Sequence, residues 1–355
     1  MTPDPLPISD SSPENPSPDT PTADAAGSHP AGSASSSPGR RVAVVVNPTK
    51  FKDLDQVRAQ LSEVCTSAGW AEPMWLETTA EDPGVGQAKE ALEAGADIVC
   101  PLGGDGTVRA VATSLVGTDV PLGLLPGGTG NLLARNLELP VDDLGEALEV
   151  VLTGSNRRID VGLARLFPDS ASPDALKGEN EDDDPRRDDE EVFLVMTGIG
   201  VDAEVMANTN EKVKGVIGWP AYVLSGIGRL WARGFRVRVT ENGSAPRVQR
   251  ARSVVVGNCG TLQGNVQLMP DAQLDDGRLD VVVMAATGPF GWAAVAVDLA
   301  SRHRRGHGQV TRLTVRGLRV TTDHPVETQI DGDPMGEQHG MAVRVLPAAL
   351  VVRVR

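Results

Sequence analysis

The stretch DIVCPLGGDGTV, residues 97–108, decides the fold of this chain. It runs from an apolar segment, Ile98 to Leu102, through a glycine-rich turn into a predicted helix that ends at Leu115. A continuous apolar run indicates a strand that is buried on both faces of a sheet. A strand, a tight turn and a helix in this order form the repeating unit of a parallel sheet with crossover helices.

The same alternation continues on both sides of this stretch. Upstream, RVAVVV (residues 41–46) is another buried-strand pattern, and apolar residues recur with a helical period between Leu54 and Ala68. Residues 40–160 are therefore predicted to form a Rossmann-like α/β domain. Its strands are predicted at residues 41–46, 74–76, 97–102 and 120–125, and its helices at residues 54–68, 87–94 and 108–115.

Beyond residue 190 the chain is rich in valine and in turn residues, which indicates antiparallel strands. Residues 161–355 are predicted to form a β-sandwich, whose last strands are free to return to the first domain. The predicted fold class is therefore α/β plus β. Strands are predicted at residues 192–196, 235–240, 253–256, 279–284, 309–315 and 342–346, and helices at residues 219–231 and 290–302.

The charge of the chain is concentrated in two segments. The net charge is −15, from 33 Lys or Arg and 48 Asp or Glu. Residues 1–39 hold nine prolines, nine serines and five acids, and residues 168–191 hold eleven acids against three bases. Both are predicted to be disordered, the second as an acidic insertion, because neither has enough apolar residues to form a core. This charge excludes a generally basic surface of the kind that binds nucleic acid.

The sequence also predicts where the protein works. No run of 18 or more apolar residues occurs, so no transmembrane helix is expected. Residues 1–39 lack the basic and apolar regions of a secretory signal. Cys65, Cys100 and Cys259 are odd in number and lack metal-binding spacing, which is typical of free thiols in a reducing compartment. We therefore expect a cytoplasmic protein.

Three polar loops are predicted to follow strands at their carboxyl ends, where ligands bind in parallel sheets. They are Asn47-Pro48, the turn from Gly103 to Thr107 and the turn from Pro126 to Asn131. Glycines let the backbone approach a phosphate, and the helix that follows offers free N–H groups. Asp105 would repel a phosphate, so its carboxylate is expected to face Mg²⁺ or a ligand hydroxyl. The alternative is a set of ordinary glycine turns in which Asp105 caps the helix.

Together the three loops resemble those of the diacylglycerol kinase catalytic domain family. This family contains bacterial diacylglycerol and lipid kinases, with sphingosine kinases as relatives and NAD kinases as more distant ones. The second half of the chain resembles the family as well, in the segments TGIGVDA (residues 197–203), MPDA (residues 269–272), DDGRLD (residues 275–280) and IDGD (residues 330–333).

The resemblance implies an N-terminal nucleotide-binding domain, a C-terminal β-sandwich and an active site in the cleft between them. It implies ATP and Mg²⁺ as cofactors and transfer of the γ-phosphoryl group to a lipid hydroxyl, most simply from ATP to diacylglycerol to give phosphatidic acid. A sphingoid base or another hydroxylated lipid is the main alternative, followed by an NAD kinase and a binding module without catalysis. A lipid substrate implies peripheral association with the inner face of the membrane. A homodimer is one of the oligomeric states that the sequence leaves open.

Matched positions in the motifs assign roles to individual residues. Asp333 is expected to be the base that takes the hydroxyl proton, with Asp331 and Asp105 holding a catalytic Mg²⁺. The alternative for Asp331 and Asp333 is an Asp-Gly hairpin turn at the surface. A structural Mg²⁺ is expected on Gln273, Asp276 and Arg278. The residues expected to bind the nucleotide are Asn47, Thr78, Gly103, Gly104, Asp105, Gly106, Thr107, Gly128, Thr129 and Asn131.

The chain departs from the family pattern at several positions. Arg109 and Ala110 stand where many members have Asn and Glu, and Leu132 stands where many have Asp. Asp333 is one methylene shorter than the usual Glu. A Ser-Gly pair is missing after Asn47-Pro48, so Lys50 and Lys52 are expected either to supply phosphate contacts instead or to be solvated at the surface.

Two segments are candidates for the lipid side of the site. Residues 213–231 are the most apolar stretch of the second half and are expected either to line an acyl-chain groove or to form a core helix. Residues 302–307 form a basic cluster that is expected either to attract anionic headgroups or to cap the end of a helix.

Overall fold

The structure is a computed structural model that describes residues 39–168, 187–200, 234–241, 244–262, 266–286, 291 and 309–355. The predicted helix at residues 219–231, the predicted helix at residues 290–302 except Gly291, the apolar stretch 213–231 and the basic cluster 302–307 lie outside these residues. The same holds for residues 1–38 and for most of the acidic segment.

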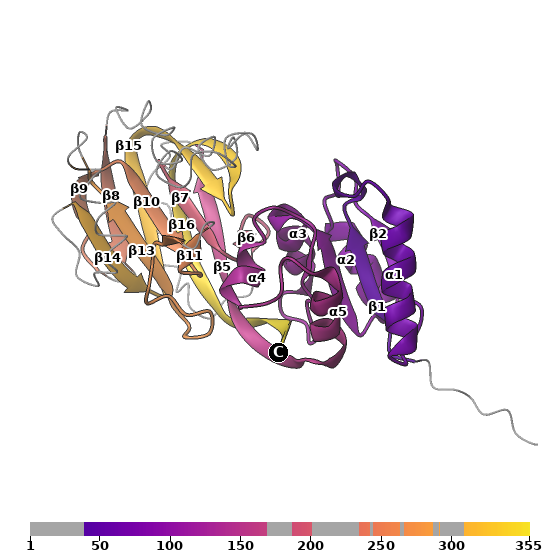
Figure 1. The fold of residues 1–355 in the computed structure, drawn as a ribbon. Helices are drawn as coiled ribbons and strands as arrows, with labels where there is room; N and C mark the ends of the chain where they lie inside the picture. Colours follow the sequence, from indigo (N-terminus) through magenta and orange to yellow (C-terminus); the bar gives the residue numbers. More distant parts are fainter. Residues whose placement is uncertain are drawn as a thin grey trace, which may run out of the picture. The chain divides into compact units, whose positions relative to one another are not determined.

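The N-terminal domain contains the predicted parallel sheet (Figure 1). Its four strands are ordered β2-β1-β3-β4, and each adjacent pair is parallel. A strand buried on both faces needs apolar residues throughout, and β1 consists of valine and alanine only. The strands are β1 (Val42–Val46), β2 (Met74–Glu77), β3 (Ile98–Gly103) and β4 (Leu125–Pro126).

Helices cover both faces of this sheet. Val42, Val44 and Val46 pack in one apolar cluster with residues of α1 and α5, whereas Ala43 and Val45 pack in another with residues of α2 and α3. Alternate residues of one strand thus meet helices on opposite sides. The helices are α1 (Leu54–Ser67), α2 (Val85–Glu93), α3 (Asp105–Leu115), α4 (Leu132–Asn136) and α5 (Leu144–Thr153), with a 3-10 turn at Pro48–Lys50.

The strand predicted at residues 120–125 is shorter than expected. Only Leu125 and Pro126 form β4, and Leu122 makes isolated parallel bridges to Val99 and Val352. The N–H of Leu122 donates to the carbonyl of Val351 at 2.8 Å. The last residues of the chain therefore lie against the parallel sheet. They form hydrogen bonds of the kind that a further strand at this edge would form.

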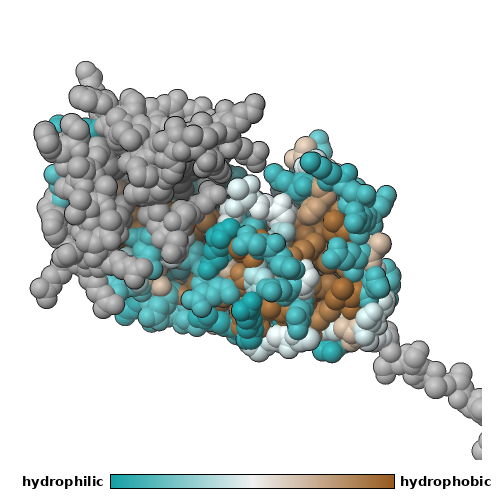
Figure 2. Space-filling model, viewed as in Figure 1, coloured by the Kyte–Doolittle hydropathy of each residue, from teal (hydrophilic) through white to brown (hydrophobic). Residues whose placement is uncertain are grey.

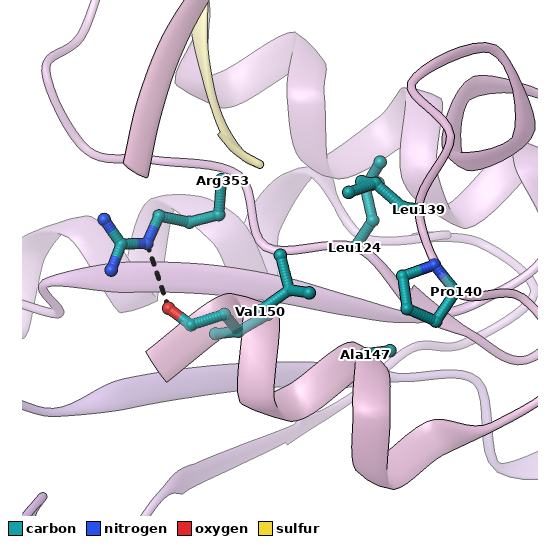
Figure 3. Close-up of a pocket in the computed structure, with 7 residues that line it drawn as sticks. Leu124, Leu139, Pro140, Ala147, Val150 and Arg353 are labelled. Carbon is teal, nitrogen blue, oxygen red and sulfur yellow. Dashed lines mark hydrogen bonds between the residues drawn. The ribbon is translucent and has the colours of Figure 1, made fainter. Parts of the chain in front are cut away.

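Arg353 fastens this C-terminal segment to α5. Its Nε donates to the carbonyl oxygen of Val151 at 2.9 Å. Beside it lies a narrow, mostly apolar gap (Figure 3). None of the residues that line this gap belongs to the glycine-rich loops, so it is no candidate for the nucleotide site: Leu124, Leu139, Pro140, Ala147, Val150, Val151 and Arg353.

The C-terminal domain is antiparallel, as predicted. Ten strands share one hydrogen-bonded network in the order β14-β13-β10-β7-β15-β16-β5-β6, with β8 on β15 and β9 on β8, and β11 pairs separately with β12. The strands are β5 (Ser155–Phe167), β6 (Glu191–Phe193), β7 (Met196–Ile199), β8 (Phe235–Glu241), β9 (Arg247–Ala251), β10 (Ser253–Gly257), β11 (Thr261–Leu262), β12 (Val266–Gln267), β13 (Leu279–Met284), β14 (Val310–Val315), β15 (Gly317–Ile330) and β16 (Asp333–Val354).

Apolar clusters lie on both faces of this sheet. Val254 and Val256 of β10 belong to one cluster, and Val255 belongs to the cluster that also contains residues of α2 and α3. Both domains therefore share one continuous core. The part of the surface drawn in Figure 2 is largely hydrophilic where it is described, with apolar residues visible between the helices. Among the described residues, no helix combines the length and apolar character that crossing a membrane requires.

Two long strands, β5 and β15, were not predicted, and β16 was predicted only at residues 342–346. β5 runs across the predicted domain boundary at residue 160, and β15 and β16 together cover most of residues 317–354. The acidic insertion predicted at residues 168–191 also extends too far, because the structure describes residues 187–191. Glu190 is buried and forms a two-point ion pair with Arg344, with both contacts at 2.8 Å, because a carboxylate in the core needs a paired cation.

Candidate active site

The loops after the parallel strands meet at one edge of the sheet, as predicted. The N–H of Asn47 donates to the carbonyl of Leu102 at 3.1 Å, and the N–H of Thr78 donates to the carbonyl of Val46 at 2.9 Å. These bonds continue the strand pairing into the loops that follow β1 and β2. Thr78 is buried, while Asn47 is partly exposed.

The turn after β3 leads directly into α3, with Gly104 at its N-cap. A Cβ on Gly103 would lie 2.6 Å from the hydroxyl oxygen of Thr107, so only glycine fits there. Thr107 itself is buried. Beside Gly104 the space is open, since only the Cα of Gly128 lies within 4 Å of an added Cβ, at 3.9 Å. The first-turn N–H groups of α3 therefore border an open region that suits an anion.

The turn after β4 packs against the turn after β3. The N–H of Gly127 donates to the carbonyl of Gly103 at 3.0 Å, and a Cβ on Gly128 would lie 2.6 Å from the Cα of Gly104. Asn131, at a left-handed φ of 46°, braces its own loop by donating from Nδ2 to the carbonyl of Gly128 at 2.9 Å. The two glycine-rich loops thus form one unit. Thr129 is exposed on it.

Asp105 ties α3 to α4. Its Oδ1 accepts the N–H of Leu132 at 2.6 Å, and its Oδ2 lies 2.3 Å from where a Cβ of Gly130 would be. Burial raises the pKa of Asp105, although the N–H of Leu132 and the charge of Arg135 act in the opposite direction. In the described part of the chain, no three His, Cys, Asp or Glu side chains gather as a metal site.

The segment after β1 carries the two lysines considered for phosphate binding. Asn47 uses its Oδ1 to accept the N–H and the hydroxyl of Thr49, at 3.1 and 2.7 Å, which shapes the turn. Lys50 and Lys52 are exposed. The ring of Phe51 lies 3.1 Å from where a Cβ of Gly127 would be, so this segment touches the second glycine-rich loop.

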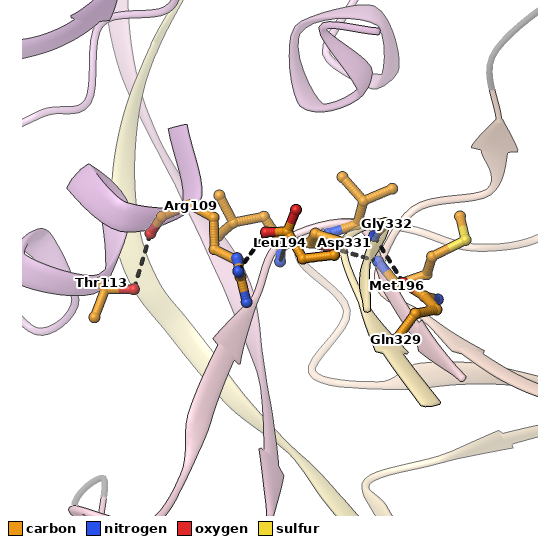
Figure 4. Close-up of polar contacts among 9 residues, drawn as sticks. Arg109, Thr113, Leu194, Met196, Gln329, Asp331 and Gly332 are labelled. Atoms are coloured by element: carbon orange, nitrogen blue, oxygen red, sulfur yellow. Dashed lines mark hydrogen bonds and ion pairs between the residues drawn. The ribbon is translucent and has the colours of Figure 1, made fainter. Parts of the chain in front are cut away.

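Asp331 fastens the hairpin between β15 and β16. Asp331 and Gly332 have φ values of 48° and 90°, as a two-residue turn of type I′ requires. The Asp331 carboxylate accepts N–H groups from Leu194, Val195 and Met196 at 2.8, 2.9 and 2.8 Å (Figure 4). These bonds explain why the strand predicted at residues 192–196 is split into β6 and β7. Burial raises the pKa of Asp331 to about 6, against the effect of these bonds.

Asp333, the first residue of β16 in the C-terminal domain, contacts α3 through its side chain. Its Oδ2 lies 2.5 Å from Nη2 of Arg109 and 3.7 Å from where a Cβ of Gly106 would be. The Asp333 side chain is 51% exposed and that of Arg109 is 18% exposed. The structure thus brings the expected base to the first turns of α3. Sequence reasoning gave Arg109 no role, although two departures from the family pattern, Arg109 and Asp333, turn out to be partners.

Gln273, Asp276 and Arg278 lie in a different place, on the turn before β13. All three are exposed, and Asp276 Oδ1 accepts the N–H of Arg278 at 3.0 Å. Asp160 of β5 holds this turn by accepting the N–H of Gly277 at 2.6 Å. Burial raises the pKa of Asp160, and the charges of Asp275 and Asp276 add to the effect. Asp275 of this turn is paired with Arg157 at 2.7 Å. Carbonyl and carboxylate oxygens are the ligands that a hard divalent cation prefers.

Comparison with protein families agrees with this architecture. Residues 41–164 match the diacylglycerol kinase catalytic domain, and residues 194–354 match the YegS C-terminal NAD kinase beta sandwich-like domain. The chain therefore contains a diacylglycerol kinase catalytic domain at residues 41–164. It is accordingly a kinase, with ATP as the phosphoryl donor that this family implies.

Individual relatives are similar at low identity. A diacylglycerol kinase of Bacillus subtilis is 24% identical over 310 residues, which cover 86% of this chain and 94% of that protein. A "Probable lipid kinase YegS-like" of Klebsiella pneumoniae is 28% identical over 269 residues, 75% of this chain and 80% of that protein. An uncharacterized protein of Synechocystis sp. is 25% identical over 274 residues, which span 56% of its length.

A solved structure shows the same fold. The crystal structure of a "putative diacylglycerol kinase" from Bacillus anthracis str. Sterne superimposes with a TM-score of 0.67 at 22% identity, covering 91% of this chain and 98% of that chain. The predicted class, an α/β domain followed by an antiparallel β-domain, is thereby confirmed. The roles of single residues stay predictions.

Proposed function

We propose that this protein transfers the γ-phosphoryl group of ATP to the hydroxyl of diacylglycerol and releases phosphatidic acid. One observation carries the proposal: the Asp333 carboxylate of the β-domain lies 3.7 Å from the Cβ position of Gly106, in the turn that leads from β3 into α3. A base and an anion site from two domains thus face one reaction centre. Relatives that carry the name diacylglycerol kinase support the choice of acceptor.

The glycine-rich loops hold the ATP phosphates in this proposal. The first turn of α3 supplies N–H groups and the positive end of a helix dipole, and the contact between Gly104 and Gly128 keeps both loops at backbone distance from the ligand. Asn47, Thr78 and Thr129, at the ends of neighbouring strands, contact the rest of the nucleotide. This arrangement positions the γ-phosphoryl group, which is most of what phosphoryl transfer requires.

The transfer step uses Asp333 as the base. The hydroxyl oxygen of the lipid forms a bond to the γ-phosphorus with one of its lone pairs, while the bond from that phosphorus to the β–γ bridging oxygen breaks. ADP leaves with the electron pair of the broken bond. The hydroxyl proton passes to the Asp333 carboxylate, whose exposure of 51% leaves room for an acceptor to approach.

Mg²⁺ accompanies ATP in this proposal and neutralises part of the phosphate charge when bound. Asp105 is the carboxylate of the glycine-rich loops, where its Oδ1 accepts the N–H of Leu132, and Asp331 accepts three backbone N–H groups. A second, structural Mg²⁺ would be held by Asp276 and by the carbonyl oxygens of Gln273 and Arg278. Work on a lipid places the protein at the inner face of the membrane, in the cytoplasm.

The decisive experiment presents purified protein and Mg²⁺-ATP with mixed micelles of diacylglycerol, a sphingoid base or a ceramide, and separately with NAD. We expect phosphatidic acid as the main product, and Asp333→Asn to abolish its formation while ATP still binds. Phosphorylation of another lipid instead would refute diacylglycerol as the acceptor, and phosphorylation of NAD alone would refute a lipid kinase. Full turnover by Asp333→Asn would refute Asp333 as the base.

A further inference from the structure

The ion pair between Arg109 and Asp333 lies at the proposed reaction centre and joins residues 224 positions apart. Arg109 belongs to α3, whose first turn is the proposed phosphate site, and Asp333 is the proposed base. The Arg109 charge also reaches the Asp331 carboxylate, whose pKa it lowers against the larger effect of burial. The guanidinium is therefore a fixed positive charge beside the atoms that react.

We propose that Arg109 is a catalytic residue that binds the γ-phosphoryl group during transfer, and that its ion pair with Asp333 holds it in place before ATP arrives. This inference deepens the proposed function and rests on it for the identity of the acceptor. A guanidinium has five N–H donors in a planar fork, more than one carboxylate oxygen takes up, so it can serve Asp333 and a phosphate oxygen together.

The charge balance of the site supports a cation at this position. In the described part of the chain, no three His, Cys, Asp or Glu side chains gather beside Arg109. The change from the family pattern at residue 109 puts a positive charge beside Asp333 in place of a neutral Asn. Charge that spreads onto the γ-phosphoryl oxygens in the transition state then meets Arg109, which is mostly shielded from water at 18% exposure.

Arg109 forms and breaks no covalent bond in the transfer step. As the acceptor oxygen bonds to phosphorus and ADP departs with its electron pair, two N–H groups of Arg109 donate to a non-bridging γ-oxygen and to Asp333. The proton of the acceptor hydroxyl goes to the Asp333 oxygen that the guanidinium leaves free. Arg109 thereby orients the base and stabilises the phosphoryl group with one side chain.

The test compares Arg109→Ala, Arg109→Lys and a matched control, Arg158→Ala, which breaks the exposed ion pair between Arg158 and Asp119. For each protein we would measure lipid phosphorylation, the slow hydrolysis of ATP without lipid, and the Kd for ATP by calorimetry. Guanidinium ion is added to the Arg109→Ala protein to replace the missing group. Thermal unfolding reports whether each variant folds.

We expect Arg109→Ala to lower kcat for both reactions by about 10²- to 10³-fold, with the Kd for ATP changed only a few-fold, and added guanidinium to restore part of the rate. Arg109→Lys should recover less, because it lacks the planar fork, and Arg158→Ala should match wild type. A kcat within three-fold of wild type for Arg109→Ala, or a loss that guanidinium does not restore in a folded protein, would overturn the inference. Arg109-dependent ATP hydrolysis without any phosphorylated lipid would refute the proposed function and uphold the role of Arg109.

Discussion

Gly104 and Gly128 touch each other in the glycine-rich loops, yet replacing each by alanine should have opposite consequences. An added Cβ on Gly104 points into open space, with one backbone atom at 3.9 Å, and the φ of −90° suits any residue. An added Cβ on Gly128 would lie 2.6 Å from the Cα of Gly104, closer than carbon atoms pack. One variant therefore fills the proposed phosphate cradle, and the other pushes the loops apart.

The magnitudes follow from these contacts. For Gly104→Ala, the lower entropy of the unfolded chain stabilises by about 0.4–1 kcal/mol, and the poorer N-cap costs an amount of the same size. The unfolding free energy should stay within about 1 kcal/mol of wild type. For Gly128→Ala, overpacking should cost about 1–3 kcal/mol. Gly39→Ala, whose Cβ would meet Ala71 at ordinary distances of 3.7 and 3.9 Å, is the control.

Urea unfolding and calorimetric titration with ATP separate the two effects. We expect the Kd for ATP to rise at least about 10-fold in Gly104→Ala, since losing one charge-assisted contact costs about 1.5–3 kcal/mol, while its stability is kept. Wild-type ATP affinity in this variant would refute the phosphate cradle. A loss of stability above about 2 kcal/mol in the same variant would refute the packing argument.

Three further outcomes are expected. Glu190→Gln should lower the unfolding free energy in urea by about 3–5 kcal/mol, because it removes the negative charge of a buried ion pair with Arg344. Burial raises the pKa of Glu190, but the hydrogen bonds and charges of Arg344 and Arg187 together bring it below its usual value, so the wild-type pair is lost only in acid. Burial raises the pKa of Asp331 from 3.8 to about 6, so the native state keeps this proton to a higher pH than the unfolded state does. The unfolding free energy therefore falls as the pH rises between these values, by about 3 kcal/mol. Asp331→Asn should remove this pH dependence from unfolding curves measured across the same range. Asp276→Asn should abolish the rise in Tm that Mg²⁺ gives the wild type, and an equal rise in both proteins would refute this cation site.

The parallel domain could be predicted from sequence because its signals are local. The run that became β1 is apolar throughout, and the Gly103–Thr107 turn marks where β3 ends and α3 begins. The long strands β15 and β16 lack such signals. Their burial follows no regular period, since buried runs such as residues 340–345 are separated by exposed residues. Pro334 and Pro347 interrupt β16, which pairs with β5, far away in the chain. Register between distant strands comes from packing, which a single sequence does not display.

In the candidate site, too, local sequence predicts some features, while contacts between distant residues decide others. The segment from Asp331 to Asp333 is the clearest example. A hairpin turn and a catalytic acid pair were competing interpretations of Asp331 and Asp333. The structure shows the two-residue turn, while the catalytic role stays a proposal. The left-handed turn sends the Asp331 carboxylate inward, where Leu194, Val195 and Met196 leave N–H groups free between β6 and β7. With the turn fixed in this way, Asp333 projects toward Arg109. In the proposed mechanism the Asp333 carboxylate must hold its position against water, and Asp331, two residues earlier in the chain, anchors the turn that carries it.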